Sequence, residues 1–253
     1  MRPFINVPYD MVEPNLARIV SLGIGIEVHI HNNLLHNLDR RQVQGVGQRL
    51  AELQIPCTFH APFMDLSPGG FDERIVTLTR DTLKRSLEMA VCLGAISAVF
   101  HPGYDRWRFG DHQQLWLDQS VETWTMLLRE SPAETAILLE NVFEEAPSTL
   151  VALFKEIQKP NFGFCFDAGH FNLFSRATLR TWLTAMKGVV VEMHLHDNNG
   201  SADDHKPIGT GTFPFRELKG FLSMIPRPVT YVAEVHGEAT AMESIKNLKE
   251  FLS

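Results

Sequence analysis

Short apolar runs alternate with longer amphipathic segments along the whole chain. Apolar runs of four to eight residues are typical of buried strands, and apolar positions three and four residues apart are typical of helices. Residues 72–93 show the helical spacing at Ile75, Leu83 and Leu87, and Gly94 lies where such a helix would end. The pattern predicts strands at residues 4–7, 24–30, 57–60, 98–101, 136–140, 163–167, 189–196 and 230–234. It predicts helices at residues 12–21, 40–54, 72–93, 113–130, 148–157, 177–186, 214–224 and 241–252.

This alternation predicts the fold class, an α/β protein with a closed (β/α)8 TIM barrel. Strands that alternate with helices form parallel sheets, and eight units of roughly 30 residues each fill a barrel of this length. An open doubly wound sheet is the alternative, and the absence of a GxGxxG motif after the first strand disfavours it. Because no linker or change of composition interrupts the chain, we expect one domain over residues 1–253.

Composition and charge narrow the range of partners. The 253 residues are 44% hydrophobic and 21% charged, which supports a large core, and the formal net charge of −7 disfavours a broad grip on nucleic acid or on an anionic membrane. No apolar run is long enough to span a bilayer, and the first residues lack a secretory pattern. Cys57, Cys92 and Cys165 have no paired spacing, so we expect buried thiols in a reduced, cytoplasmic protein.

Six consecutive predicted strands end in a histidine or a carboxylate. The carboxyl ends of barrel strands converge on one face, where active sites lie. A lone histidine at a strand end is usually structural, but a half-buried cluster of carboxylates is costly without a cation. The sequence therefore predicts a metal site at the barrel mouth. The strand-end residues are His60, His101, Glu140, Asp167, His194 and Glu234, and His170, Asp203 and His205 follow in loops.

Together these motifs resemble the xylose-isomerase-like TIM-barrel superfamily, also called the AP endonuclease family 2 group, over essentially the whole chain. The resemblance implies one of two chemistries: phosphodiester hydrolysis with three zinc ions, as in endonuclease IV, or sugar isomerisation and epimerisation with one divalent metal. The motifs that carry it are His60-Ala61-Pro62, His101-Pro102-Gly103, Glu140-Asn141, and residues 166–170, 194–197 and 203–211.

The resemblance also implies a different set of metal ligands for each branch. The one-metal branch requires only Glu140, Asp167, His194 and Glu234. The three-metal branch would place His60 and His101 on one ion with Glu140 as a bridge, Asp167, His194 and Glu234 with Glu140 on the second ion, and His170, Asp203 and His205 on the third.

Formal charge distinguishes the two ligand sets. One dication with three carboxylates has a charge of −1, which suits a neutral polyhydroxylated substrate, whereas three dications with four carboxylates have a charge of +2, which suits an anionic phosphodiester. Five histidines and four carboxylates fit zinc or manganese, and the one-histidine subset fits magnesium, manganese or cobalt. We therefore expect divalent zinc or manganese, two or three ions per chain.

The leading hypothesis from the sequence is a metal-dependent hydrolase that cleaves a small, nucleotide-like phosphodiester, with Glu140 and Glu234 as catalytic residues. Some members of the superfamily cut such a bond in the nucleotide loop of corrinoids. The alternative is a one-metal sugar or keto-acid isomerase or epimerase, in which Glu140 and Glu234 would exchange a proton with the substrate. A non-catalytic metabolite-binding barrel is disfavoured because all nine ligand positions carry a competent residue.

An AP-site endonuclease is less favoured than a hydrolase of small molecules. The loop at residues 31–37 contains no Lys or Arg. The strongest basic cluster is Arg106-Trp107-Arg108, which would either meet a phosphate or, as we favour, pack Trp107 on the barrel rim. We therefore expect a small, anionic substrate and neither a nucleic-acid nor a membrane partner, while the sequence leaves the oligomeric state open.

Other polar residues lie near the predicted mouth without a clear ligand role. Glu27, in the second predicted strand, would contact substrate or pair with a Lys or Arg inside the barrel. His196 would orient a ligand or would be a polar residue beside the mouth, and the two interpretations are equally favoured. The remaining histidines are expected to be solvated in loops or on helix faces: His29, His31, His36, His112 and His236.

Overall fold

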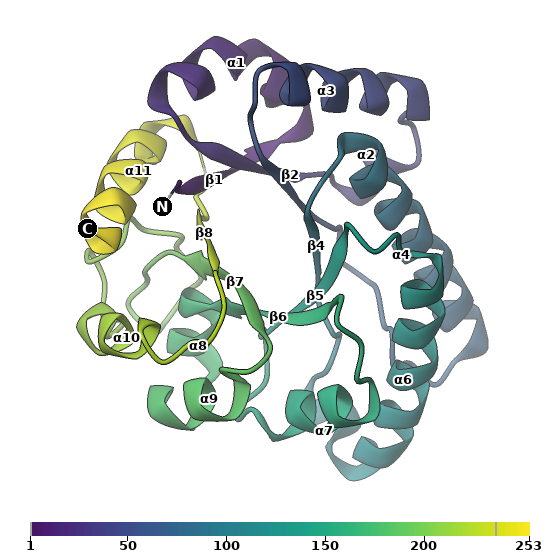
Figure 1. Cartoon of the computed structure of the whole chain (residues 1–253). Coiled ribbons are helices and arrows are strands. Elements are labelled where there is room, and N and C mark those ends of the chain that lie inside the picture. The colour runs from purple at the N-terminus through teal and green to yellow at the C-terminus, as the bar shows by residue number, and fades with distance from the viewer. Residues whose placement is uncertain (1, 236) are drawn as a thin grey trace.

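The computed structural model describes residues 2–235 and 237–253, and its eight parallel strands close into a barrel. Each strand pairs with the next in the chain, and β8 pairs with β1 (Figure 1). This confirms the predicted fold class. The strands are β1 (Phe4–Pro8), β2 (Gly25–His29), β3 (Cys57–His60), β4 (Ser97–Phe100), β5 (Ala136–Glu140), β6 (Phe162–Asp167), β7 (Val190–Leu195) and β8 (Thr230–Ala233).

Helices surround the barrel (Figure 1) and include short ones that the hydrophobic pattern does not predict: α2, α5, the 3-10 helix η1 and α8. The helix α8 begins where the Asp167 carboxylate accepts a hydrogen bond from the His170 backbone N–H at 2.6 Å. The helices are α1 (Tyr9–Leu22), α2 (Asn32–Leu35), α3 (Arg40–Glu52), α4 (Glu73–Leu93), α5 (Arg106–Phe109), η1 (Gly110–His112), α6 (Gln113–Glu130), α7 (Ser148–Glu156), α8 (Ala168–Phe174), α9 (Leu179–Met186), α10 (Phe215–Leu222) and α11 (Glu238–Leu252).

Two packed layers position the strand ends. Between strands and helices lies an apolar core that includes the fully buried Trp116, Trp124 and Trp182. Inside the barrel, side chains two residues apart on a strand point the same way. Each strand-end ligand position therefore lies above a buried residue of the same strand, and these lower residues are Thr58, Val99, Leu138, Cys165, Glu192 and Val232.

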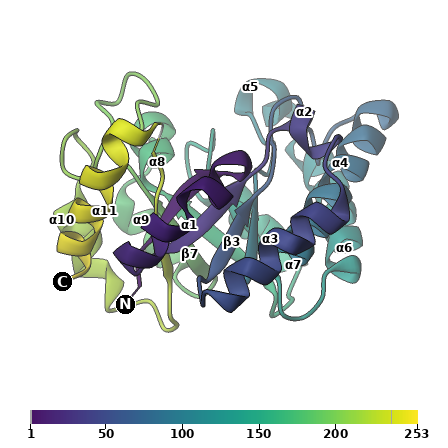
Figure 2. The same ribbon diagram turned by 90° about the horizontal axis from the view of Figure 1, so that it is seen from above.

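The carboxyl ends of the strands form the face opposite the chain termini. Figure 2 shows α2 and α5, which follow β2 and β4, on the edge opposite to the labelled N and C ends. The nine predicted ligand positions belong to strand ends and loops of this same face, except that His170, expected in a loop, lies in the short helix α8. The barrel thus brings together residues that are far apart in the sequence.

The cysteines and the helix lengths test two further expectations. All three cysteines are free; Cys57 and Cys165 are buried as expected, whereas Cys92 is only half-buried. Among the described residues, no helix combines the length and the apolar character needed to cross a bilayer.

Two glycines of α3 provide a matched test of helix packing. A Cβ on Gly47 would lie 2.5 Å from the Cys92 carbonyl oxygen of α4, whereas a Cβ on Gly45 would meet nothing within 4 Å. Alanine normally favours a helix over glycine by about 1 kcal/mol. We therefore expect Gly45→Ala to raise the free energy of unfolding by up to about 1 kcal/mol, and Gly47→Ala to lower it by about 1–3 kcal/mol.

Chemical denaturation of both variants would measure this difference. Equal stabilisation by the two substitutions would contradict the close approach of α3 to α4.

Candidate metal centre

Glu140, at the end of β5, lies at the centre of the site and is fully buried. Its Oε2 atom is 3.2 Å from His60 Nε2, 3.5 Å from His101 Nε2 and 3.4 Å from His194 Nδ1. These three histidines come from the ends of β3, β4 and β7. The barrel therefore directs three imidazole nitrogens at one carboxylate oxygen.

Two observations are consistent with a metal site: the spacing of the ligand atoms, and buried polar atoms that lack a hydrogen-bond partner. Two ligands at 2.0–2.1 Å from a tetrahedral zinc ion lie about 3.3 Å apart. Among the described residues, His101 Nε2, His194 Nδ1 and Glu234 Oε2 are buried and have no hydrogen-bond partner, which is costly unless another group satisfies them. A dication among Glu140, Asp167, His194 and Glu234 would satisfy His194 Nδ1 and Glu234 Oε2, and one among His60, His101 and Glu140 would satisfy His101 Nε2.

The four residues that both family branches would use as metal ligands lie close together. Ligand atoms of Glu140, Asp167, His194 and Glu234 all lie within 4.8 Å of one another. His194 Nδ1 is 3.3 Å from Glu234 Oε2 and 3.8 Å from Asp167 Oδ2. His60, His101 and Glu140 form a second group by the same criterion.

The third predicted set also converges. Asp203 Oδ2 is 3.4 Å from His170 Nε2 and 3.1 Å from His205 Nε2. His170 connects this set to the centre, because its Nδ1 lies 2.8 Å from Glu140 Oε1. All nine residues predicted from the sequence therefore lie in one continuous cluster, and their role as ligands stays a prediction.

The loop that carries Asp203 and His205 is held by Asp197, which follows β7. The Asp197 carboxylate accepts hydrogen bonds from the backbone N–H groups of Gly209 (3.1 Å), Gly211 (2.8 Å) and Phe213 (3.0 Å). This fully buried acid thereby fixes the loop to the barrel. This role of Asp197 was not predicted from the sequence, although an acid followed by the Gly209-Thr210-Gly211 segment is a usable signal.

The charges in the cluster depend on one another. Burial would lower the pKa of His60, but the hydrogen bond to Glu140 and the negative charges of Glu140, Glu27 and Glu234 together raise it to about 9. Burial would raise the pKa of Glu140, and the positive charges of His194 and His101 instead hold it well below its usual value. Protons and divalent ions therefore compete for the same side chains of this cluster.

The structure also tests the predictions for residues other than the nine predicted ligands. His196 Nε2 lies 3.1 Å from Asp167 Oδ2, a contact that orients this carboxylate. The expected packing of Trp107 on the rim is wrong, because its side chain is 84% exposed. Glu27 pairs with His194 rather than with a Lys or Arg, and His29 is half-buried in β2 rather than solvated. His236 lies outside the described residues.

The chain matches one family model and shows sequence similarity to proteins of other organisms. The family model described as xylose isomerase-like TIM barrel matches residues 16–251. The uncharacterised protein MJ1311 of Methanocaldococcus jannaschii is 28% identical over 86% of this chain and 77% of its own length. A probable endonuclease 4 of Mycobacterium leprae is 22% identical over 69% of this chain and 71% of its own length.

Two solved structures match almost the entire chain. A D-tagatose 3-epimerase-like protein is 25% identical with a TM-score of 0.82, and the match covers 100% of this chain and 97% of that protein. The TTHB071 protein of Thermus thermophilus, whose crystals were soaked with zinc chloride, is 26% identical with a TM-score of 0.79. That match covers 99% of this chain and 98% of the other.

Metal binding should depend on pH across the neutral range. Because the pKa values of His194 and His60 are raised in the ion-free protein, with His60 at about 9, a dication must displace protons near pH 7. Zinc affinity should therefore rise with pH, by about tenfold per pH unit for each displaced proton. Isothermal titration between pH 6 and 8.5, in buffers of different ionisation enthalpy, measures both quantities.

The exposed His112 offers a matched control, since His112→Gln should leave this pH dependence unchanged. A zinc affinity that does not vary over this range would contradict the protonated cluster.

Proposed function

Because this chain belongs to the xylose isomerase-like TIM-barrel family, we propose that it is a metal-dependent isomerase or epimerase of a small, sugar-like hydroxy-carbonyl compound. The observation that carries this proposal is the compact set of Glu140, Asp167, His194 and Glu234 at four consecutive strand ends. The comparisons favour this alternative over the hydrolase that the sequence analysis preferred. Full-length similarity to an epimerase-like structure supports it.

These residues supply the parts that the reaction needs. A bound divalent ion would polarise the carbonyl group of the substrate and make the adjacent C–H bond more acidic. Glu140 and Glu234 are the two carboxylates positioned to remove and return that proton. With one dication and three carboxylates, the formal charge of −1 suits a neutral sugar better than an anion.

The histidines outside the four-residue set have a role in this proposal. His60, His101 and His170 surround Glu140 with ring nitrogens. In a one-metal site these nitrogens would donate hydrogen bonds to hydroxyl groups of the substrate. A polyhydroxylated ligand offers several acceptors for such donors, as a sugar does.

A phosphodiester hydrolase is the second candidate, and a separate observation favours it. His170, His205 and Asp203 converge at 3.1–3.4 Å, as expected for ligands of one further ion. His60, His101 and Glu140 likewise form a group of their own. Three zinc or manganese ions on nine ligands would give a formal charge of +2 and would suit a small anionic phosphodiester.

An assay of two substrate panels separates the candidates. We expect the wild-type protein with Mn²⁺ or Zn²⁺ to epimerise at least one ketose, with uptake of deuterium from D₂O at the inverted carbon. Glu234→Gln should reduce this rate by at least about 10²- to 10⁴-fold, because it removes a proton-transferring carboxylate that is also a proposed ligand of the ion. Asp203 lies outside the four-residue set, so Asp203→Ala should affect substrate affinity more than the maximal rate.

The opposite outcome would identify the hydrolase. Wild-type cleavage of a nucleotide-like phosphodiester, lost in Asp203→Ala and unaccompanied by turnover of any ketose, would contradict the isomerase.

Elemental analysis provides an independent test of the same choice. The isomerase predicts one tightly bound ion per chain, lost in Glu234→Gln and retained in Asp203→Ala. Three ions in the wild type and two in Asp203→Ala would instead support the hydrolase.

A further inference from the structure

Two further buried carboxylates lie beneath the metal centre and do not face the proposed ion. Glu27 on β2 and Glu192 on β7 are both fully buried. Glu192 precedes His194 by two residues on the same strand, so both side chains point into the barrel. A buried carboxylate needs a compensating partner, and both of these lie close to the same imidazole.

The two nitrogens of His194 have different surroundings. Its Nδ1 faces Glu140 and Glu234, whereas its Nε2 lies 3.0 Å from Glu27 Oε2 and 3.6 Å from Glu192 Oε1. A neutral imidazole that binds a cation through Nδ1 carries its single proton on Nε2. Glu27 is the acceptor within hydrogen-bonding distance of that proton.

Glu192 has a different partner. Its Oε2 accepts a hydrogen bond from the Ser97 hydroxyl at 2.7 Å. Its Oε1, the atom nearer His194, is buried without a hydrogen-bond partner among the described residues. Glu192 therefore shares the depth and the neighbour of Glu27 but not its hydrogen bond, which makes it a matched control.

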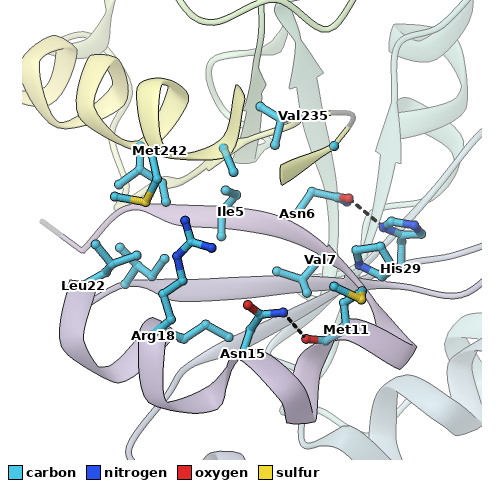
Figure 3. Close-up of a pocket in the computed structure, with 16 residues that line it drawn as sticks. Ile5, Asn6, Val7, Met11, Asn15, Arg18, Leu22, His29, Val235 and Met242 are labelled. Atoms are coloured by element: carbon cyan, nitrogen blue, oxygen red, sulfur yellow. Dashed lines mark hydrogen bonds between the residues drawn. The ribbon is translucent and has the colours of Figure 1, made fainter. Parts of the chain in front are cut away.

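Glu27 is itself held by two residues on its other side. Asn6 Nδ2 donates to Glu27 Oε1 at 3.0 Å, and Asn6 Oδ1 lies 2.6 Å from His29 Nδ1 (Figure 3). Burial lowers the pKa of His29 to about 4, so the ring is neutral. Because Asn6 Nδ2 donates to Glu27, the Asn6 carbonyl oxygen faces His29 and accepts from its Nδ1–H. Each hydrogen bond between His29 and His194 thus has a defined donor and a defined acceptor, and Glu27 accepts from both sides.

We infer that Glu27 is a positioning residue, which Asn6 and His29 orient so that it fixes the proton of His194 on Nε2 and leaves Nδ1 free for the metal ion. This inference rests on metal binding at His194, which both candidate reactions require. Carboxylates that accept from a metal-binding histidine orient the ring and increase its basicity. Glu27 acts through His194 and does not touch the substrate.

The polarity of the network predicts an unusual effect for an isosteric substitution. In Glu27→Gln, the Asn6 amide N–H₂ would still require an acceptor and would hold the new side-chain oxygen. The new N–H₂ group would then face His194 Nε2, which could no longer carry its proton there. The proton would be favoured on Nδ1, the nitrogen that must bind the ion.

A second substitution should reverse this effect. With Asn6→Asp added to Glu27→Gln, residue 6 accepts from both His29 and the new amide N–H₂. The amide oxygen then turns toward His194 Nε2 and accepts its proton again. A purely structural role for Glu27 predicts no such rescue, because the double variant changes more of the barrel interior than the single one.

The experiment measures Zn²⁺ affinity of the full-length protein by competition with a chromophoric chelator at pH 7.5. We expect Glu27→Gln to weaken the tightest site by about 10- to 100-fold, with Glu192→Gln within about threefold of the wild type. The double variant should recover most of the loss. In the zinc-loaded wild type, proton NMR should show a His194 Nε2–H signal protected from solvent exchange.

The results distinguish failure of the proposed function from failure of the inference about Glu27. A wild-type protein that binds neither Zn²⁺ nor Mn²⁺ nor any other divalent ion would overturn the proposed function and this inference together. Zinc binding by the wild type with equal affinity in Glu27→Gln, or equal losses in Glu27→Gln and Glu192→Gln, would overturn this inference alone. If Glu27→Gln does not fold, absence of the protected His194 Nε2–H signal from the zinc-loaded wild type would overturn it.

Discussion

The burial of Glu140 is the constraint on which the rest of the site depends. A fully buried carboxylate is costly unless positive charge or hydrogen bonds surround it. Here the imidazoles of His60, His101, His170 and His194 lie 2.8–3.5 Å from its oxygens. The ends of β3, β4 and β7 hold three of these histidines, and α8 holds His170; Asp203 also contacts His170, and Glu27 contacts His194. The cluster therefore extends from one carboxylate to the barrel interior and to the loops at the mouth.

The residues of the cluster differ in how rigidly the fold holds them. Glu140 and His194 belong to strands, and Asp167 both ends β6 and caps α8. Asp203 and His205 lie on a loop, and the backbone of His205 has a φ of 47°, a conformation that non-glycine residues adopt at a cost. Asp197 offsets that cost by holding the loop with three backbone hydrogen bonds. The strand-borne set is thus the preorganised part of the site, and the loop-borne set is an addition to it.

Much of this arrangement follows from local sequence pattern. Period-two and period-3.6 spacing identify the strands and helices, and strand ends converge in any parallel barrel, so the cluster around Glu140 is predictable without coordinates. The function of Glu27 is not, because it depends on a contact with His194, 167 positions away, through the register and closure of the barrel. A polar residue within a predicted strand reveals burial but not its partner. The sequence left Glu27 between a substrate contact and a Lys or Arg partner, and the structure pairs it with His194 instead.

The same nine side chains are compatible with both proposed reactions, and the number of bound cations distinguishes the isomerase from the hydrolase. With one ion on the strand-borne set, the ion and its three carboxylates have a formal charge of −1, and His60, His101 and His170 keep the N–H groups that they donate to substrate oxygens. With three ions, those histidines lose their protons and the site becomes positive, so it attracts a phosphodiester and no longer offers donors to a sugar. The identity of the nine metal-binding side chains does not determine the reaction, because they are compatible with both the one-metal and the three-metal site. The two proposals therefore differ in whether ions also occupy the set of His60, His101 and Glu140 and the loop that Asp197 holds.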